Sequence, residues 1–345
     1  MSFVTLRSIC ISGLVFFSYS SFATEIHGAG ATFPALLYQK WAANYSIYKD
    51  MTVDYLGVGS GEGIKRIEEK LVDFGGSDMP LKLEDLNKNG LLQFPMVMGA
   101  ITPVINLPKV YIAQLKLDGQ TLAAIFMGRI KKWDDPGLQK LNPNLYLPDM
   151  PIIVVHREDK SGTTFNFTNY LSKVSNDWKI NIGEGLAVNW PVGLTGKGNS
   201  GVAKKVKETT GSIGYVDYAD AMEHQLDYVL LKNRDGNFVR PNAGSTQAAA
   251  AGAHWDVANG FYQILTDAPG ETSWPIAATT FILMRKDIES IEHFQTILRF
   301  IDWNYRTGEL PAMYLDFVML PKQVIDQVRT SWHNIKDSAG KTVWH

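Results

Sequence analysis

The segment 157–163, Arg-Glu-Asp-Lys-Ser-Gly-Thr, constrains the fold more than any other part of the chain. It follows strand-forming residues at 152–155 and leads into a helical pattern. A strand that ends in such a turn and continues as a helix is typical of an α/β sheet with ligand sites at its strand ends. The turn also presents the unpaired N–H groups and partial positive charge of a helix N-terminus, which attract anions.

Two further turns of the same kind occur upstream, at 31–33 and 59–61, and each also precedes a helical pattern. If these turns converge with 161–163, their N–H groups form a cage for an anion. Hydroxyl groups are added by Thr32, Ser60, Ser161 and Thr163. Arg157 adds a planar guanidinium that suits two oxygens of an oxyanion. The alternatives are that the Ser and Thr side chains only cap their own helices, and that Arg157 forms a surface salt bridge.

Asp78 would make such a cage selective. An ionised carboxylate can only accept hydrogen bonds, so it favours an oxyanion that still carries a proton. Phosphate near neutral pH keeps at least one proton and sulfate keeps none, so Asp78 would exclude sulfate. The alternative is a turn aspartate that caps its own backbone. Asp159 is close enough in sequence to pair with Arg157, whereas Glu158 and Lys160 are expected to face solvent.

Residues 1–23 have the pattern of a secretory signal, in which Arg7 precedes an apolar stretch at 9–17 and a small-x-small cleavage site at 21–23. The apolar stretch is short for a membrane span, and a short anchor helix is the alternative. The only cysteine, Cys10, lies inside this segment. We therefore expect an exported, soluble chain that has no thiol and is held together by its core.

The charge balance and motifs exclude several classes of protein. The chain of 345 residues has a formal net charge of −2, which argues against nucleic acid or an anionic membrane as the main partner. Enzyme motifs are largely missing: 57–61 is followed by Glu62 where a dinucleotide motif needs glycine, and Gly198 stands where a P-loop needs Ser or Thr. The histidines show no paired ligand spacing. No catalytic residue, metal or cofactor is therefore expected.

Strands and helices are predicted to alternate, which indicates an α/β fold. Strands are expected at 51–56, 72–74, 211–216 and 279–284, with an extended crossing segment at 102–106. Helices are expected after Pro34 and at 64–71, 115–126, 248–253 and 324–332, with turns at 57–61 and 75–78 and a loop at 127–136. The length of the chain, without a long linker or a repeat, favours two domains joined by short ordered segments.

These segments together resemble the periplasmic phosphate-binding proteins of phosphate-specific ABC transporters over essentially the whole mature chain. The matching segments are 28–34, 57–60, 72–78, 128–134, 157–163, 196–199, 213–216, 274–276 and 279–283. The resemblance implies a type II periplasmic binding protein fold, in which two α/β lobes enclose a central ligand cleft and are joined by two crossing hinge segments. Lobe one would comprise 24–97 and 276–345, and lobe two 98–275.

The resemblance also implies the phosphate contacts. They fall on Thr32, Phe33 (backbone), Ser60, Asp78, Arg157, Ser161, Gly162 (backbone) and Thr163, with Asp159 paired to the arginine. Two residues depart from the family pattern. Glu62 places a carboxylate in the first turn of a helix near the expected anion, where it either weakens binding or points to solvent. Lys160 replaces a small residue and could partly offset that charge.

The function implied by the resemblance is the binding of inorganic phosphate in the periplasm and its delivery to inner-membrane permease subunits driven by a cytoplasmic ATPase. Such a receptor is expected to be a monomer, to be no enzyme and to need no cofactor or metal. Two alternatives remain open. One is a receptor for another tetrahedral oxyanion, such as sulfate or molybdate. The other is a phosphate-ester hydrolase, which would need a metal cluster or an activated nucleophile.

Overall fold

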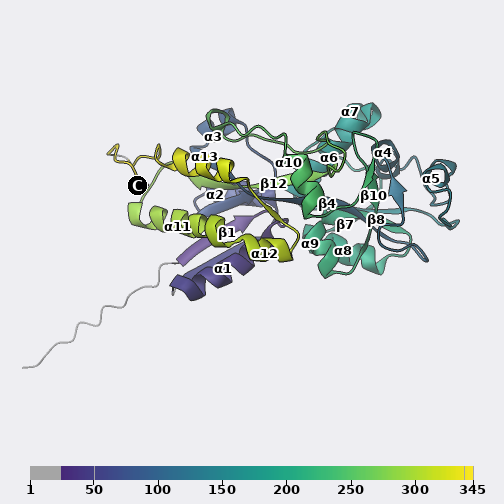
Figure 1. Ribbon diagram of the computed structural model, residues 1–345, viewed down its shortest axis with the longest axis horizontal. Helices are drawn as coiled ribbons and strands as arrows, with labels where there is room; N and C mark the ends of the chain where they lie inside the picture. The colour runs from purple at the N-terminus through teal and green to yellow at the C-terminus, as the bar shows by residue number, and fades with distance from the viewer. Residues whose placement is uncertain (1–24, 50, 338, 345) are drawn as a thin grey trace, which may run out of the picture.

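The protein is described here by a computed structural model that covers residues 25–49, 51–337 and 339–344, and the predicted signal peptide lies outside the described residues. Two α/β lobes lie side by side along the longest axis of the molecule (Figure 1). Among the described helices, none combines the length and the apolar character that a bilayer crossing requires.

The strands of the two lobes form one continuous sheet in the order β2-β1-β3-β12-β4-β8-β6-β7. Their bounds are β1 (Glu25–Gly30), β2 (Thr52–Gly57), β3 (Phe74–Ser77), β4 (Leu91–Asn106), β6 (Ile153–Arg157), β7 (Leu194–Gly196), β8 (Ser212–Asp217) and β12 (Ala277–Arg285). Short strands β9 (Asp227–Tyr228) and β13 (Val318–Met319) pair with β4, while β5 (Lys116–Leu117), β10 (Leu230–Lys232) and β11 (Phe238–Val239) form a separate small sheet.

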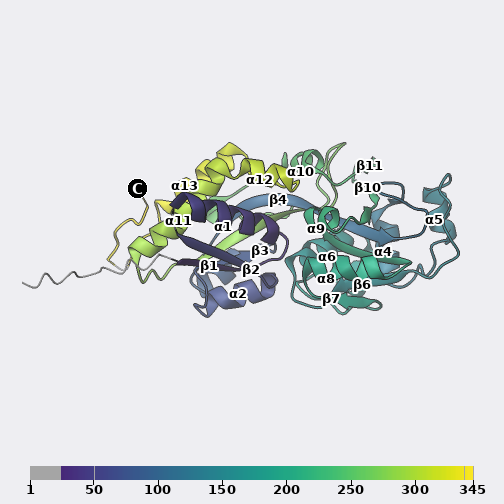
Figure 2. The same cartoon turned by 90° about the horizontal axis from the view of Figure 1, so that it is seen from below.

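Helices cover both faces of the sheet in each lobe (Figures 1 and 2). The first lobe has α1 (Ala35–Lys49), α2 (Ser60–Glu68), α3 (Leu83–Lys88), α11 (Ile291–Thr307), α12 (Glu309–Tyr314) and α13 (Lys322–Trp332). The remaining helices are α4 (Gly119–Phe126), α5 (Pro136–Leu141), α6 (Gly162–Val174), α7 (Asn176–Asn181), α8 (Gly198–Glu208), α9 (Tyr218–Glu223), α10 (Ala243–Ala250) and the 3₁₀ helix η1 (Val257–Asn259).

Strand β4 is long because it runs through both lobes. Its residues from Leu91 to Ala100 pair with β12, and those from Ile101 to Asn106 pair antiparallel with β8. The Ile101 N–H donates to the Ile276 carbonyl at 2.9 Å, so the outgoing and returning chain segments lie side by side. We propose that the two lobes divide at this pair of segments, close to the predicted boundaries at 97/98 and 275/276.

Each of the three predicted turns follows a strand with parallel neighbours: β1, β2 or β6. Strand β1 pairs in parallel with β2 and β3, and β6 pairs in parallel with β8 and β7. The predicted face of the strand at 51–56 is confirmed, since Val53 and Tyr55 are buried. The helix predicted after Pro34 is also confirmed as α1, which buries Leu37, Trp41 and Tyr45 at the predicted spacing. Strand β2 therefore ends, and α1 begins, near the shared carboxyl end of the parallel strands β1 and β2.

The strand and turn predicted at 72–78 are wrong in position. Strand β3 contains Phe74–Ser77, so the glycines that predicted a turn lie inside the strand. The reason is packing, because a Cβ on Gly76 would come within 2.2 Å of the Tyr55 hydroxyl. The glycines let the neighbouring strand's tyrosine lie close against the backbone, which the local sequence pattern does not reveal.

Three predicted helices have bounds that differ from those expected. Helix α2 ends at Glu68 because Lys70 takes a left-handed conformation with φ 61°, and Leu71 is 65% exposed rather than packed. In the helix predicted at 115–126, Lys116–Leu117 form strand β5, and Asp118 caps the helix that follows by accepting the Thr121 N–H. The tract at 248–253, predicted to be part of an Ala-rich helix, contributes only its first three residues to α10, which begins at Ala243 and ends at Ala250.

Candidate anion-binding site

The three predicted turns converge where the two lobes meet. In Figure 2, α2 of one lobe faces α6 and α8 of the other. The turn before α2 contacts the turn before α6, because the Gly162 N–H donates to the Ser60 hydroxyl oxygen at 3.1 Å. The turn before α1 lies beside them, since Ala31 N donates to the Gly76 carbonyl at 2.8 Å and Thr32 lies close to Gly198 of α8. The predicted convergence is therefore present.

Ser60 does not cap its own helix, so the capping alternative is wrong for this residue. The N-cap position of α2 is Gly59, and no side chain in the described part of the chain caps it. The Ser60 oxygen instead accepts two N–H groups, from Gly162 and from Asp78 at 3.2 Å. Because both bonds use the oxygen as an acceptor, the hydroxyl hydrogen of this buried serine is still free to donate to a ligand.

Ser161 does cap its helix, so the capping alternative holds there. Its oxygen accepts the Thr164 N–H at 3.1 Å, which fixes the first turn of α6 and leaves the hydroxyl hydrogen free. The hydroxyls of Thr32 and Thr163 are buried and have no hydrogen-bond partner among the described residues. Phe33 is buried against Phe317, with ring centroids 5.3 Å apart, and this contact positions the backbone at the start of α1.

Arg157 is not part of a surface salt bridge, because its side chain is only 1% exposed. Its Nε and Nη2 donate to the two carboxylate oxygens of Asp159 at 2.8 and 2.5 Å, which is the pair that the sequence predicted. Burial opposes ionisation of Asp159, but the hydrogen bonds and charge of Arg157 hold the pKa of this carboxyl below its ordinary value. Asp159 therefore holds the guanidinium at the end of β6, and the positive charge stays close to the junction of the two lobes.

Asn199 was not among the predicted site residues, although it ends the segment 196–199 that carries part of the resemblance. Its side-chain oxygen accepts Nη1 of Arg157 at 2.6 Å, and its amide donates to Asp217 at 2.7 Å. Burial and the neighbouring Asp220 raise the pKa of Asp217 well above its ordinary value. The amide thus links the arginine to a second buried carboxyl group and restricts the guanidinium to one orientation.

Asp78 does not cap its own backbone, so the turn alternative is wrong. The residue is 1% exposed, and neither carboxylate oxygen has a hydrogen-bond partner among the described residues. Burial raises its pKa to about 7, an increase that the Thr280 hydroxyl, the Arg157 charge and the Ser60 hydroxyl partly oppose. The carboxyl group therefore changes its protonation state near neutral pH.

The lobes are closed on each other. Besides the bond between Gly162 and Ser60, the Gly61 N–H donates to the Lys160 carbonyl at 3.0 Å, and the Asn166 amide donates to the Asp78 carbonyl at 2.8 Å. Asn166 was also not predicted. Together these bonds fasten the first turn of α2 and the end of β3 to α6.

Glu62 points away from the site. Its carboxylate accepts Nε of Arg66 at 2.9 Å, one turn along α2, and the side chain is 41% exposed. Lys160 is exposed at the rim, where its aliphatic stem lies against Gly61. The charge of Glu62 is thus compensated outside the cage, as the solvent-facing alternative predicts.

Comparison with known proteins identifies the family. A family model described as a PBP superfamily domain matches residues 19–306. The phosphate-binding protein PstS of Pasteurella multocida is 49% identical over 95% of this chain and 96% of its own length. The chain belongs to the PstS family. The PstS protein of Haemophilus influenzae is also 49% identical, over 90% of this chain and 93% of its own length.

Solved structures support the two-lobe fold expected for a PstS protein. A high-affinity periplasmic phosphate-binding protein, PfluDING, solved with phosphate at pH 8.5, has a TM-score of 0.75 at 22% identity and covers 89% of this chain and 94% of its own. A putative phosphate ABC transporter substrate-binding protein from Clostridium perfringens has a TM-score of 0.63 at 17% identity, covering 86% of this chain and all of its own. At these identities the likeness concerns the fold alone.

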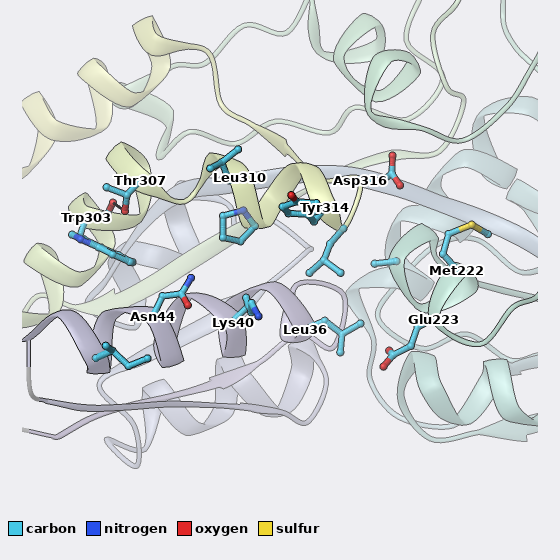
Figure 3. Close-up of a pocket in the computed structure, with 14 residues that line it drawn as sticks. Leu36, Lys40, Asn44, Met222, Glu223, Trp303, Thr307, Leu310, Tyr314 and Asp316 are labelled. Atoms are coloured by element: carbon cyan, nitrogen blue, oxygen red, sulfur yellow. Dashed lines mark hydrogen bonds between the residues drawn. The ribbon is translucent and has the colours of Figure 1, made fainter.

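Two other features of this PstS protein lie outside the junction. Within the described part of the chain, Asp220, Glu223 and His224 have ligand atoms within 4.8 Å of one another, a spacing that could hold a metal ion, but the Asp220 carboxylate already accepts the Ser200 hydroxyl. A groove of about 1040 Å³ lies between α1, α12 and α9 (Figure 3). It is lined largely by apolar side chains such as Leu36 and Leu310, which cannot replace the water shell of an oxyanion.

Proposed function

We propose that this protein binds inorganic phosphate in the periplasm, between its two lobes, and delivers it to the inner-membrane permease of an ABC transporter. The observation that carries the proposal is a group of buried polar atoms at the junction that have no hydrogen-bond partner among the described residues: the carboxylate of Asp78 and the hydroxyls of Thr32 and Thr163. Buried polar groups in native proteins are nearly always paired. A ligand with both oxygens and a proton would pair all of them.

The donors at the junction outnumber the acceptors. The Arg157 guanidinium, the hydroxyl hydrogens of Ser60 and Ser161, and the N-termini of α2 and α6 all present positive charge or hydrogen-bond donors. A small tetrahedral anion can accept hydrogen bonds from these donors from several directions at once. Because the donors come from both lobes, an anion would favour the closed arrangement over an open one.

Asp78 would decide which anion is accepted. When ionised, its carboxylate repels sulfate and accepts the proton of phosphate. When protonated, it can donate to either anion. Since burial raises the pKa of Asp78 to about 7, the ionised acceptor dominates above pH 7 and the protonated donor dominates below it. The preference for phosphate over sulfate is therefore expected to be strongest above pH 7.

The relatives are named as binding proteins, and we propose that this protein likewise has no catalytic activity. We further propose that it acts as an exported monomer without a metal or cofactor. The closure of the lobes around the anion would signal to the permease that the receptor is loaded.

Competition titration calorimetry of phosphate against sulfate between pH 5 and pH 8 tests the proposal. Wild-type protein is expected to prefer phosphate by roughly 10⁴-fold at pH 8, because unpaired buried groups support discrimination of that size. Sulfate binding should strengthen as the pH falls through about 7, when Asp78 gains a proton. In Asp78→Asn the preference for phosphate should narrow, and sulfate binding should lose its pH dependence, since an amide donates to sulfate at every pH.

The matched control is Asp54→Asn, which removes the same charge from an exposed position on β2. It should leave both the preference and its pH profile unchanged. Burial holds the pKa of Tyr38 and that of Tyr55 well above 10, so neither phenol competes with Asp78 in this range. Equal binding of sulfate and phosphate by wild-type protein at pH 8 would favour a receptor for another oxyanion. Turnover of a chromogenic phosphate ester by metal-free protein would support a hydrolase.

A further inference from the structure

A buried side-chain amide of α6 forms a hydrogen bond across the junction between the lobes. Asn166 is 2% exposed, and its amide nitrogen donates to the Asp78 carbonyl oxygen at 2.8 Å. The same nitrogen donates to the Gly162 carbonyl oxygen at 3.0 Å. Because both neighbours are carbonyl oxygens, which can only accept, the amide must turn its nitrogen towards them, and both of its hydrogens are used.

The bond to Gly162 orients Asn166 before the lobes meet. Both residues belong to α6, with Asn166 one turn after Gly162, so this bond does not depend on the position of the other lobe. A side chain that is already oriented loses less conformational freedom when it forms a second bond. The second amide hydrogen is therefore ready to reach Asp78 when the lobes close.

The backbone of Asp78 is bonded to both lobes. Its N–H donates to the Ser60 hydroxyl oxygen of its own lobe at 3.2 Å, and its carbonyl oxygen accepts Asn166 of the other lobe. These two backbone groups flank the Cα from which the Asp78 carboxyl group projects, so the two bonds together restrict its direction. The bond to Ser60 can persist when the lobes separate, whereas the bond to Asn166 has to break.

We propose that Asn166 is a positioning residue that stabilises the closed lobes through the Asp78 carbonyl and thereby sets how slowly bound phosphate dissociates. The proposal rests on the phosphate-binding function proposed above. Asn166 is not among the predicted anion contacts, so it acts through Asp78 and not on the ligand itself. We call its hydrogen bond to the Asp78 carbonyl the Asn166 latch.

The latch is expected to act on dissociation because of the order in which contacts form. Phosphate enters between separated lobes, before Asn166 reaches Asp78. Release requires the lobes to separate again, which breaks the latch while its two polar groups still have to regain water. Among variants of one binding interface, most differences in affinity likewise arise from the dissociation rate. Loss of the latch should therefore shorten the bound state without slowing its formation.

The test is the dissociation rate of radiolabelled phosphate at pH 8, measured by a chase with excess unlabelled phosphate, together with the association rate. Asn166→Leu keeps a side chain of similar size but leaves the Asp78 carbonyl without the amide donor. We expect dissociation to become about tenfold faster, since a buried polar group that loses its partner has an effect of that size. The association rate should change by no more than about twofold.

Two further measurements separate the latch from general stability. The melting temperature of Asn166→Leu without phosphate should not fall, because leucine is the better helix former and the latch joins two lobes that fold on either side of it. If Asn166→Leu does not fold, Asn166→Ala decides, since it removes the same amide without adding a large apolar group. The same faster dissociation is expected for it.

Asn169→Leu is the matched control. Asn169 is also a buried asparagine of α6, but its side chain bonds Glu184 and Thr266 within the predicted lobe two. Its replacement should lower the melting temperature and leave the dissociation rate of phosphate unchanged. An equal increase of the dissociation rate in Asn166→Leu and Asn169→Leu would overturn the latch, because it would show only that α6 has been loosened.

A wild-type dissociation rate in Asn166→Leu would also overturn the latch, while the phosphate-binding function would stand. A wild-type protein that binds no phosphate would instead refute that function. Small-angle scattering of the two ligand-free proteins would then decide on the latch: a more extended Asn166→Leu would support it, and equal dimensions would overturn it.

Discussion

Arg157→Met is expected to raise the dissociation constant for phosphate by about a thousandfold. Removing one partner from a buried, hydrogen-bonded charge pair typically costs 2–5 kcal/mol of binding free energy. Arg157 is the buried guanidinium at the junction, and Asp159 and Asn199 fix its orientation. A lysine could not replace its planar fork. Titration calorimetry of phosphate at pH 8 measures the change directly.

Arg157→Met also lowers the folding stability, and this effect must be measured separately from the loss of phosphate affinity. Without the guanidinium, the largely buried Asp159 carboxylate loses its counter-charge, which costs roughly 3–5 kcal/mol of folding stability. Arg157→Met/Asp159→Asn removes that charge while keeping an oxygen to accept the Gly198 N–H. We expect the double variant to recover the melting temperature but not the affinity.

The control is Arg66→Met, which removes an arginine of α2 that pairs with Glu62 outside the cage. It should change phosphate affinity by no more than about threefold, because its charge lies on the solvent side of the helix. Phosphate binding of wild-type strength in the stable double variant would show that the arginine does not hold the anion.

The sequence contains the local chemistry of the site. The turns at 31–33, 59–61 and 161–163 are predictable because each combines a small residue with the start of a helical period, and backbone geometry then fixes where the N–H groups point. Arg157 and Asp159 are two residues apart, so their pairing is also local. These features require no knowledge of the tertiary fold.

What the sequence does not reveal are partners from distant segments. Asn199 lies 42 residues beyond Arg157, and Asn166 lies 88 residues beyond the Asp78 carbonyl that it bonds. Each partner is an ordinary polar residue, and only the sheet order brings it to the site. The segment 196–199 was a usable signal for Asn199, since it opens a helix in the same way as the predicted turns.

Gly162→Ala should weaken phosphate binding by about a hundredfold or more without destabilising either lobe. A Cβ at this position would lie 2.4 Å from the Ser60 hydroxyl oxygen and 2.7 Å from the Asp78 carboxylate, closer than real side chains approach. The lobes would have to stay apart, and an anion would then lose the charge-assisted hydrogen bonds of one lobe. Gly162 begins α6 and does not have a positive φ, so alanine suits the isolated helix at least as well.

Gly162→Ala is expected to prevent the lobes from closing while each lobe stays folded, so lobe closure and folding can be measured separately. Small-angle scattering should show that wild-type protein becomes more compact with phosphate and that Gly162→Ala does not. Its melting temperature without phosphate should match wild type, while the increase caused by phosphate should largely disappear, since ligand stabilisation follows affinity. Gly244→Ala is the control, because this glycine also lies in the first turn of a helix, α10, but among the described residues its Cβ would meet only the Asn242 side chain at 3.4 Å. Phosphate-induced compaction of Gly162→Ala with unchanged affinity would mean that the loaded lobes do not meet at Gly162 and Ser60, and that the anion is held by a different closure.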